Sequence, residues 1–414
     1  MPLLDENDKI VRYKYTITEF YILYENEKEK YVLPNTRISN INILNRYLSN
    51  AFPIFNINLV LESSIYYKIL KNKNTVKFKL RMQKYEINEM GERSSYYSDF
   101  INDTFSLILD DDDNDLEEKL RNQIYSDGDE NELNATINNI ELYFFKSSLI
   151  KRTKEKMNCV LRDATVTNAI AYMCTRSSIN NVLMSPIENK TMYKQLIIPP
   201  LTLTQSLKYL DAYYGLYKRG SLIYFDLNYT YILNFKSECT AYQKNEKKNT
   251  YIIIPEYGGI MTKQVGSVKK YNNNTDNYIV INSETMKILN ESISNDIIVG
   301  NDVTFISYNN DDVKFTKSDN DAVQNSIIEN LGLNEYYLSE YDAQLKSKEV
   351  KIVLNMVDID LSAIEPNKKF IIEFEDTKLS RKYKGTYILC SKDIYFKKNG
   401  DEFSPYVSCT FVKG

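Results

Sequence analysis

Alternation of polar and apolar residues at both ends of the chain limits its fold more than any other feature. In the segment VKFKLRM (residues 76–82) every second residue is apolar, and the residues between are Lys77, Lys79 and Arg81. A period of two is typical of a strand in a sheet with one solvated face. Similar segments fill residues 11–86 and return after residue 251, so we expect an antiparallel sandwich or barrel at each end.

The N-terminal region is interrupted by a polar and acidic stretch at about residues 88–134. We interpret this stretch as an insertion between two strands of one barrel, with a short helix near 114–125. The run Asp110 to Asp113 lacks the register and the twelfth-position Glu of a calcium loop, so a solvated acidic loop is favoured. The strands predicted before the insertion are RYKYTITEFYILYE, KYVLP, TRISNINIL, FNINLVLE, SIYYKIL and TVKFKLRMQKYEI.

The middle of the chain contains a degenerate repeat. The segment TVTNAIAYM from Thr165 matches TLTQSLKYL from Thr202 almost position for position, and each is followed by a strand-like segment, NNVLM or SLIYF. Leu203, Leu207 and Leu210 recur at helical spacing, and Gly215 is a plausible helix end. Thr202 or Thr204 is the expected cap. The pattern predicts a duplicated helix and strand within a small α/β module, which also includes the strands KQLIIPP and YTYILNF.

Strands return in the last third of the chain. One helix, DNDAVQNSIIENLGL from Asp319, is predicted within this region, and turns are expected at EPNKK, KYKG and KKNGD. The predicted strands are GIMTKQVGSVKKY, DNYIVINS, NDIIVGNDVTFISY, EVKIVLNMVDI, KKFIIEFED, GTYILCSKDIYFK and PYVSCTFVKG.

These patterns predict a mainly β chain with α+β elements, in which two β-barrel domains are joined by a small α/β module. The first barrel spans residues 1–151 with the acidic insertion, the module spans 152–250, and the second barrel with its inserted helix spans 251–414. The length of 414 residues suits two or three domains. No Pro-rich or Gly/Ser-rich linker separates them, so we expect fixed domain positions.

Composition disfavours several classes of function. The chain has no histidine and no tryptophan but has 35 tyrosines, which suit strands and interfaces. The absence of histidine removes the commonest general base and metal ligand. A formal net charge of -4 gives no general affinity for nucleic acid. No basic leader or 18-residue apolar run occurs, so neither export nor membrane insertion is predicted.

The individual chemistries that remain are weakly supported. The five cysteines, at positions 159, 174, 239, 390 and 409, have no C-x-x-C pairing and are expected to be reduced thiols. Glycosidase subsites normally use tryptophan, and YGGIMTKQVGS lacks phosphate-loop spacing, so we interpret it as a turn. Cys390 and Cys409 lie in alternating strands, where a small buried residue is the usual role. We therefore predict a protein that is not an enzyme, with no catalytic, cofactor-binding or metal-binding residues.

The order barrel, α/β module, barrel resembles the baseplate hub, or tail hub, of long-tailed bacteriophages, a family related to the hub part of type VI secretion spike proteins. The resemblance lies in the pattern of three stretches and includes no short diagnostic motif. The acidic insertion departs from the family pattern. The three stretches are NAFPIFNINLVLESS (residues 50–64), TLTQSLKYLDAYYGLYKRGSLIYFD (202–226) and FIIEFEDTKLSRKYKGTYILCSKDIYFKKNGDEF (370–403).

The resemblance implies a virion structural protein that is made in the host cytoplasm and assembled into the tail baseplate. It implies a homotrimer whose six barrels form a pseudo-hexameric ring between the hexameric tail tube and the central spike protein. Further implied partners are the tape measure protein and the baseplate wedge proteins. DNA would pass through the ring without specific binding, and no membrane is involved. We therefore expect Lys77, Lys79 and Arg81 to point away from the bore or to be countered by carboxylates of a neighbouring chain.

Two alternatives remain open. A receptor-binding or adhesin-like tail module that recognises cell-wall glycan is the second hypothesis, although such modules usually carry long loops and this chain is expected to have short turns. An enzyme that uses paired carboxylates is the third hypothesis.

Overall fold

The computed structural model describes the two ends of the chain and its middle. The described ranges are 9–24, 30–88, 90–108, 137–179, 181–217, 221–234, 250–256, 266–269, 277–282, 286–289, 305–309, 312–316, 351–374 and 377–413.

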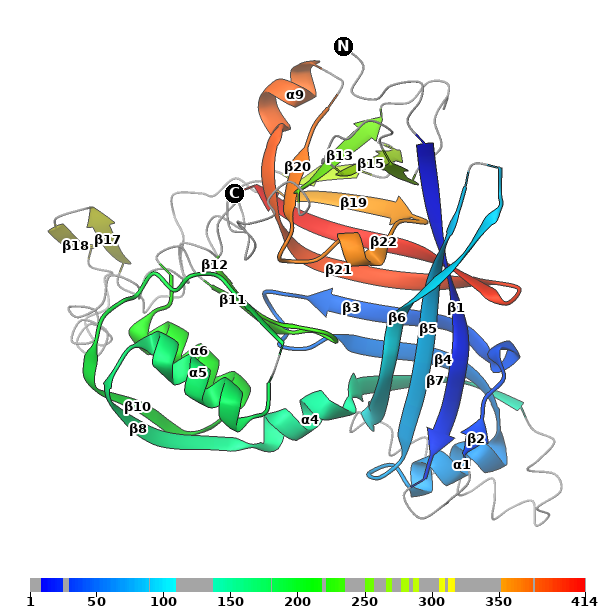
Figure 1. The fold of residues 1–414 in the computed structure, drawn as a ribbon, viewed down its shortest axis with the longest axis horizontal. Helices are drawn as coiled ribbons and strands as arrows, with labels where there is room; N and C mark the ends of the chain where they lie inside the picture. The colour runs from blue at the N-terminus through cyan, green and yellow to red at the C-terminus, as the bar shows by residue number, and fades with distance from the viewer. Residues whose placement is uncertain are drawn as a thin grey trace.

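Most strands belong to one large sheet, which occupies the right and upper parts of Figure 1. Its N-terminal strands are β1 (Lys9–Leu23), β2 (Tyr31–Val32), β3 (Ile38–Arg46), β4 (Ile54–Glu62), β5 (Lys77–Ile87), β6 (Arg93–Ile108) and β7 (Ile137–Lys146). Its C-terminal strands are β13 (Thr250–Glu256), β14 (Gly266–Lys269), β15 (Asn277–Asn282), β16 (Met286–Leu289), β19 (Lys351–Val357), β20 (Lys369–Ile372), β21 (Gly385–Asn399) and β22 (Glu402–Lys413). The prediction of a mainly β chain with some helix is confirmed.

Strands from the two ends of the chain pair directly with each other. β3 lies antiparallel to β21, with Asn42 opposite Tyr395, and β1 pairs with β22 through Tyr15 and Phe403. The strands predicted as two barrels therefore share one hydrogen-bonded sheet and one apolar core. The division into domains at 1–151, 152–250 and 251–414 stays a prediction.

Alternation in the sequence becomes alternation in burial, as expected. On β5 the side chains of Phe78, Leu80 and Met82 are buried, and Val76 just before the strand is buried too. Lys77 is exposed and Lys79 is half-buried. The predicted strand pattern of residues 76–82 is confirmed, because a sheet buries only every second side chain when one face meets water.

The segment SIYYKIL was predicted as a strand, and this prediction was wrong. Residues 63–71 form the helix α1 (Ser63–Lys71). Tyr66, Ile69 and Leu70 are spaced by three and four residues, and all three are buried against the main core. Isoleucine and tyrosine favour strands intrinsically, but burial of one helical face outweighs that weak preference.

The polar stretch from residue 88 to residue 98 is not an insertion that interrupts the strands. It forms the turn and the first part of β6, and β6 pairs with β5 in a long antiparallel hairpin. The turn is closed by the backbone hydrogen bond from Gly91 N to Asn88 O, 3.0 Å, with Gly91 at φ +80°. Polar composition misled the prediction, since a strand exposed on both faces needs no apolar residues. The rest of the expected insertion lies outside the described residues.

A smaller α/β module occupies the left side of Figure 1. Helices α5 and α6 lie between a two-stranded sheet, β8 and β10, and a three-stranded sheet in the order β11, β12, β9. The helix α4 (Ser147–Lys154) precedes the module. The bounds are β8 (Lys156–Ala164), α5 (Val166–Arg176), β9 (Val182–Met184), β10 (Tyr193–Thr202), α6 (Leu203–Tyr214), β11 (Ser221–Phe225) and β12 (Thr230–Asn234).

The predicted repeat is visible as a duplicated strand, helix and strand. Thr165 caps α5 and Thr202 caps α6, and each forms a capping box with the residue three positions later, Asn168 or Gln205. In such a box the threonine oxygen accepts from a free backbone N–H while the later side chain accepts from the cap. Gly215 ends α6 at φ 70°, as expected. The predicted helices, caps and following strands are confirmed.

The strands β11 and β12 connect the module to the large sheet because both of their faces are buried. Tyr224 and Tyr231 belong to the main core, whereas Phe225 and Ile232 belong to the core around the helices. A backbone hydrogen bond of 2.9 Å from Phe225 N to Ala51 O adds a direct link to the turn between β3 and β4. The module is therefore packed on the sheet and not merely tethered to it.

The remaining elements are short. They are η1 (Asn35–Arg37), η5 (Leu361–Ala363), α9 (Thr377–Tyr383) and the hairpin β17 (Phe305–Asn309) with β18 (Asp312–Thr316). The turn at EPNKK is confirmed by a hydrogen bond from Lys368 N to Glu365 O, and KKNGD is the turn between β21 and β22. In KYKG, Lys382 and Tyr383 instead form the end of α9, and Gly385 begins β21. The acidic run at 110–113 and the helices predicted near 114–125 and from 319 lie outside the described residues.

Candidate functional site

The cysteines of the described region are placed as buried or half-buried thiols. Burial raises the pKa of Cys390 to about 12 and raises that of Cys409 further. The pKa of Cys159 is also raised by burial. A raised pKa keeps the thiol protonated at neutral pH, which is the opposite of what a nucleophile needs. Cys239 lies outside the described residues.

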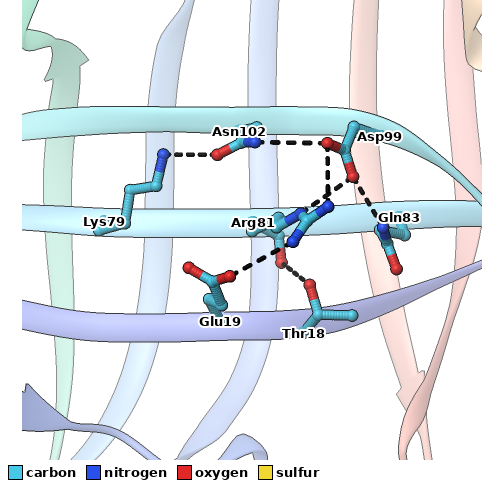
Figure 2. A network of polar contacts seen from close by, with 7 residues as sticks. All are labelled: Thr18, Glu19, Lys79, Arg81, Gln83, Asp99 and Asn102. Carbon is cyan, nitrogen blue, oxygen red and sulfur yellow. Dashed lines mark hydrogen bonds and ion pairs between the residues drawn. The ribbon is translucent and has the colours of Figure 1, made fainter.

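Polar side chains form a hydrogen-bonded network on the solvent face of β1, β5 and β6 (Figure 2). Arg81 donates to both carboxylate oxygens of Asp99, at 3.0 and 3.3 Å, and to Glu19 at 3.4 Å. Gln83 also donates to Asp99, and Lys79 donates to Asn102 at 2.5 Å. Figure 2 shows that these side chains follow one another across three neighbouring strands.

Arg81 is countered by carboxylates of its own chain, Glu19 on β1 and Asp99 on β6, and not by those of a neighbouring chain. The direction of Lys77, Lys79 and Arg81 relative to a bore stays a prediction. The Arg81 guanidinium, followed by Gln83, holds the pKa of Asp99 below its ordinary value. Arg81 therefore adds little free positive charge to this face, whereas Lys79 donates to the neutral amide of Asn102 and Lys77 is exposed.

A groove of about 630 Å³ crosses six neighbouring strands, from β7 through β4, β3, β21 and β22 to β19. Its first row of side chains follows the strand register directly. Each residue of this row is paired with the next in the sheet, in the order Tyr143, Asn56, Asn42, Tyr395, Tyr406 and Val357. The groove thus crosses the seam between N-terminal and C-terminal strands.

A second row of the groove contains Leu44, Asp393, Ser408 and Asn355, which are paired in the same way. Glu141 lies at the β7 end, where its carboxylate accepts hydrogen bonds from Asn56 and from Tyr143. The volume is in the range of small-ligand sites. The lining combines aromatic rings, amides and carboxylates with apolar residues such as Leu44 and Val357, which suits a partner group that has both apolar and polar parts.

Sequence analysis did not identify this groove. Part of a signal was present, because asparagines alternate with buried isoleucines along both TRISNINIL and FNINLVLE. Adjacent strands with matching Asn positions predict a polar sheet face. The tyrosines of the other strands are far away in sequence, and no local pattern brings them to the same face.

A buried polar cluster joins the large sheet to the α/β module. Lys392 on β21 is only 5% exposed, and its ammonium donates to the carbonyl oxygens of Ile364, 2.7 Å, and Leu361, 3.4 Å. Its charge also acts on the carboxyl groups of Asp226 and Glu365. Burial raises the pKa of both carboxyl groups, and the Lys392 charge opposes that rise.

Two tyrosines complete the junction. The hydroxyl of Tyr224 donates to Asn45 Oδ1 at 3.0 Å, and Asn45 Nδ2 donates to the backbone oxygen of Lys392 at 3.2 Å. The ring of Tyr47 meets the ring of Tyr224 edge-on, with centroids 4.7 Å apart. Burial raises the pKa of both tyrosines well above the ordinary value. The cluster is a structural joint between β3, β11 and β21.

The described residues contain neither a cluster of metal ligands nor a helix that could span a membrane. No group of three or more Cys, Asp or Glu side chains in the described ranges is arranged to hold a metal ion. Among the described helices, none has the length and apolar character needed to cross a membrane.

Comparison of the fold with solved structures gives similarities that extend over nearly the whole chain. The tail protein from Neisseria meningitidis MC58 has a TM-score of 0.43 and 10% identity, with 96% of each chain covered. The 43 kDa tail protein of prophage MuSo2 from Shewanella oneidensis has a TM-score of 0.42 and 9% identity, covering 94% of this chain and 96% of that one. The E. coli c3393 protein, a type VI secretion component, has a TM-score of 0.43 and 7% identity, covering 95% and 76%.

Comparison by sequence matches a family model but no individual curated protein. A search of curated proteins finds no match. The family model of the bacteriophage PBS1 gene 109 protein, however, matches residues 7–412, which includes all three stretches that resemble phage hub proteins. The prediction of a bacteriophage protein is thereby confirmed, and the chain belongs to the family of the bacteriophage PBS1 gene 109 protein.

Proposed function

We propose that this chain is a hub protein of a phage tail baseplate, a homotrimeric adaptor between the hexameric tail tube and the central spike. Family membership supports a phage origin. The observation that carries the proposal is the direct pairing of β3 with β21 and of β1 with β22. A symmetry adaptor must hold its two β halves in a fixed relation, and continuous hydrogen-bonded strands provide that rigidity.

In this proposal residues 1–151 and 251–414 each supply one barrel of a six-barrel ring, and residues 152–250 form the connecting module. The tube, the spike, the tape measure protein and the wedge proteins are the partners, and the assembled protein belongs to the virion. DNA passes through the bore without specific binding. The pairing of Arg81 with Asp99 and Glu19 supports this last point, because an unpaired cation would retain phosphate.

The copy number and position of the chain in the tail test the proposal. Tails are labelled with antibody to this chain and viewed by electron microscopy, and the hub complex extracted from them is weighed by native mass spectrometry. We expect label at the distal end of the tail and three copies per complex. Label distributed along the tube, or a stable dimer or hexamer of this chain, would contradict the proposal.

A second candidate function, recognition of cell-wall glycan, is favoured by one observation. Three exposed tyrosines line the groove together with asparagines and carboxylates, and sugars stack on aromatic rings and bond to such groups. Oligosaccharide binding by the purified chain that is lost in groove variants would support this function over the first.

A further inference from the structure

The groove presents negative charge, and among the described residues no cation lines it. Glu141 and Asp393 line it, and its lining includes no lysine or arginine. Within the described ranges neither carboxylate has an ion-pair partner within 4 Å. Arg46 and Lys397 lie one row further along β3 and β21 and do not line the groove. A cation from another molecule would therefore find two carboxylates that face the groove without a cation beside them in its lining.

The unsatisfied polar atoms of the lining are acceptors. Asn42 Oδ1 and Asp393 Oδ1 are buried and make no hydrogen bond among the described residues. Burial raises the pKa of Asp393, and the charge of Arg46 opposes that rise. A buried acceptor without a donor is costly, so a group that supplies only donors fits best. Guanidinium has five N–H donors and no acceptor, whereas a sugar hydroxyl supplies both.

The tyrosines of the groove supply flat aromatic surfaces on which a guanidinium group can stack. Tyr395 and Tyr406 are paired across β21 and β22, with ring centroids 6.4 Å apart, and Tyr143 lies at the other end of the same row. All three are between 41% and 43% exposed. Guanidinium groups stack on tyrosine faces and bind carboxylates in a planar fork.

We propose that this groove receives an arginine side chain of a neighbouring protein in the assembled tail, held by Asp393 and stacked on Tyr395 or Tyr406. Glu141, at the β7 end of the groove, adds negative charge to the same face. The identity of the neighbour as a tail protein rests on the proposed function. The preference of the groove for arginine does not, so the two are tested separately.

The binding test uses two small probes and the full chain. Acetyl-arginine amide and acetyl-citrulline amide have nearly the same shape, but the citrulline side chain is neutral. Saturation-transfer difference NMR, in which magnetisation passes from protein to bound ligand, reports which probe binds and over what concentration range. We expect a signal from the arginine probe that saturates, and none from the citrulline probe.

Variants place the binding in the groove. Asp393→Asn should weaken binding of the arginine probe by about tenfold, the loss of affinity expected for one charge-assisted pair. Tyr406→Ala, at an exposed position, tests the stacking surface without disturbing the core. The matched controls are Asp401→Asn in the turn between β21 and β22 and Tyr213→Ala on α6, both exposed and outside the groove. Both controls should bind the arginine probe as the unaltered chain does.

Three outcomes would overturn the proposal. They are equal binding of both probes, no effect of Asp393→Asn and Tyr406→Ala in folded protein, and saturable binding of an N-acetylglucosamine trimer instead of arginine. The last would assign the groove to glycan. In phage, Asp393→Lys should block incorporation of the chain into tails while Asp401→Lys does not. Arginine binding with normal incorporation of Asp393→Lys would refute the groove as an assembly contact and leave the hub proposal untouched.

Discussion

The buried cluster around Lys392 and the exposed network around Arg81 contain the same kinds of side chain but differ in what they do for the protein. Arg81 pairs with Asp99 and Glu19 in contact with water, which screens each charge. Lys392 is removed from water and depends on carbonyl oxygens and the nearby charges of Asp226 and Glu365. Removal of the positive charge should therefore lower stability strongly at the junction, where Lys392 is buried, and hardly at all on the sheet face, where Arg81 meets water.

The largest effect is expected from Lys392→Ala. The substitution removes the ammonium that donates to two carbonyl oxygens, and each buried acceptor left without a donor costs about 1–3 kcal/mol in the free energy of unfolding. Loss of the charge that acts on Asp226 and Glu365 adds to this cost. Urea denaturation followed by circular dichroism measures it. Lys392→Met keeps most of the side-chain volume and should cost less than the alanine change. A loss below about 1 kcal/mol for alanine would contradict a stabilising role for the charge.

A smaller effect is expected from Tyr224→Phe. The substitution removes the hydroxyl that donates to Asn45 Oδ1, and this buried acceptor without a donor costs about 1–3 kcal/mol in the free energy of unfolding. The neighbouring Tyr47→Phe is the matched control, because the Tyr47 hydroxyl is buried and makes no hydrogen bond among the described residues. Removing it should cost nothing measurable in the same denaturation experiment. Equal losses for the two variants would contradict a net contribution of the hydrogen bond from Tyr224 to Asn45, because both substitutions keep the ring and remove only a hydroxyl.

The two clusters should respond to pH with opposite sign. Burial raises the pKa of Asp226 in the folded state, so its favourable contribution is complete below the unfolded pKa of about 3.9 and is lost as pH rises through the folded value. The pKa of Asp99 is lowered, mainly by the hydrogen bond from Arg81. Its contribution is therefore present above about 3.9 and is lost as pH falls through the folded value.

The measurement compares stability against pH for the unaltered chain with that of Asp226→Asn and Asp99→Asn. As the pH falls, the stability of the unaltered chain relative to Asp226→Asn should rise. Its stability relative to Asp99→Asn should fall over the same change of pH. The Asp99 effect should be the weaker, because this carboxylate is exposed. Profiles with the same sign would remove the distinction between the two clusters.

The smallest effect is expected from Arg81→Gln. Its ion pairs are open to water, and exposed pairs contribute little to stability. The denaturation midpoint should match that of Lys77→Gln, a substitution at an exposed residue of the same strand, within experimental error. A clear destabilisation by Arg81→Gln alone would indicate that the network in Figure 2 behaves as a cooperative unit.

Much of the fold could be predicted because its signals are local. Alternation along residues 76–82 correctly assigned buried and exposed side chains, and the paired threonines at 165 and 202 correctly located two capped helices. Polar composition was a poorer guide, since residues 93–98 form part of a strand. The helix at residues 63–71 was missed, because its residues favour strands unless one helical face is buried by the sheet.

The groove and the buried cluster could not be predicted from the sequence alone. Asparagines on adjacent strands hinted at a polar face, but Asn56 and Tyr406 share a groove only because β3 pairs with β21. That pairing joins segments more than three hundred residues apart, and no local pattern encodes it. The sequence analysis named no site residue, and the two unpaired acceptors in the groove became visible only with the fold.

Lys392 is the sharpest case of this division. A lysine in an alternating strand is expected to face water, yet the register of β21 against β22 shifts between Leu389 and Ser391. The irregularity turns Lys392 toward the interior, where it is buried with Ile394 and Phe396. The sequence by itself determined the strand periods, the caps and the repeat, because these depend on residues a few positions apart. Tertiary structure alone decided which charges are buried and which strands meet, because one irregular residue reverses a strand's faces and pairing partners lie far along the chain.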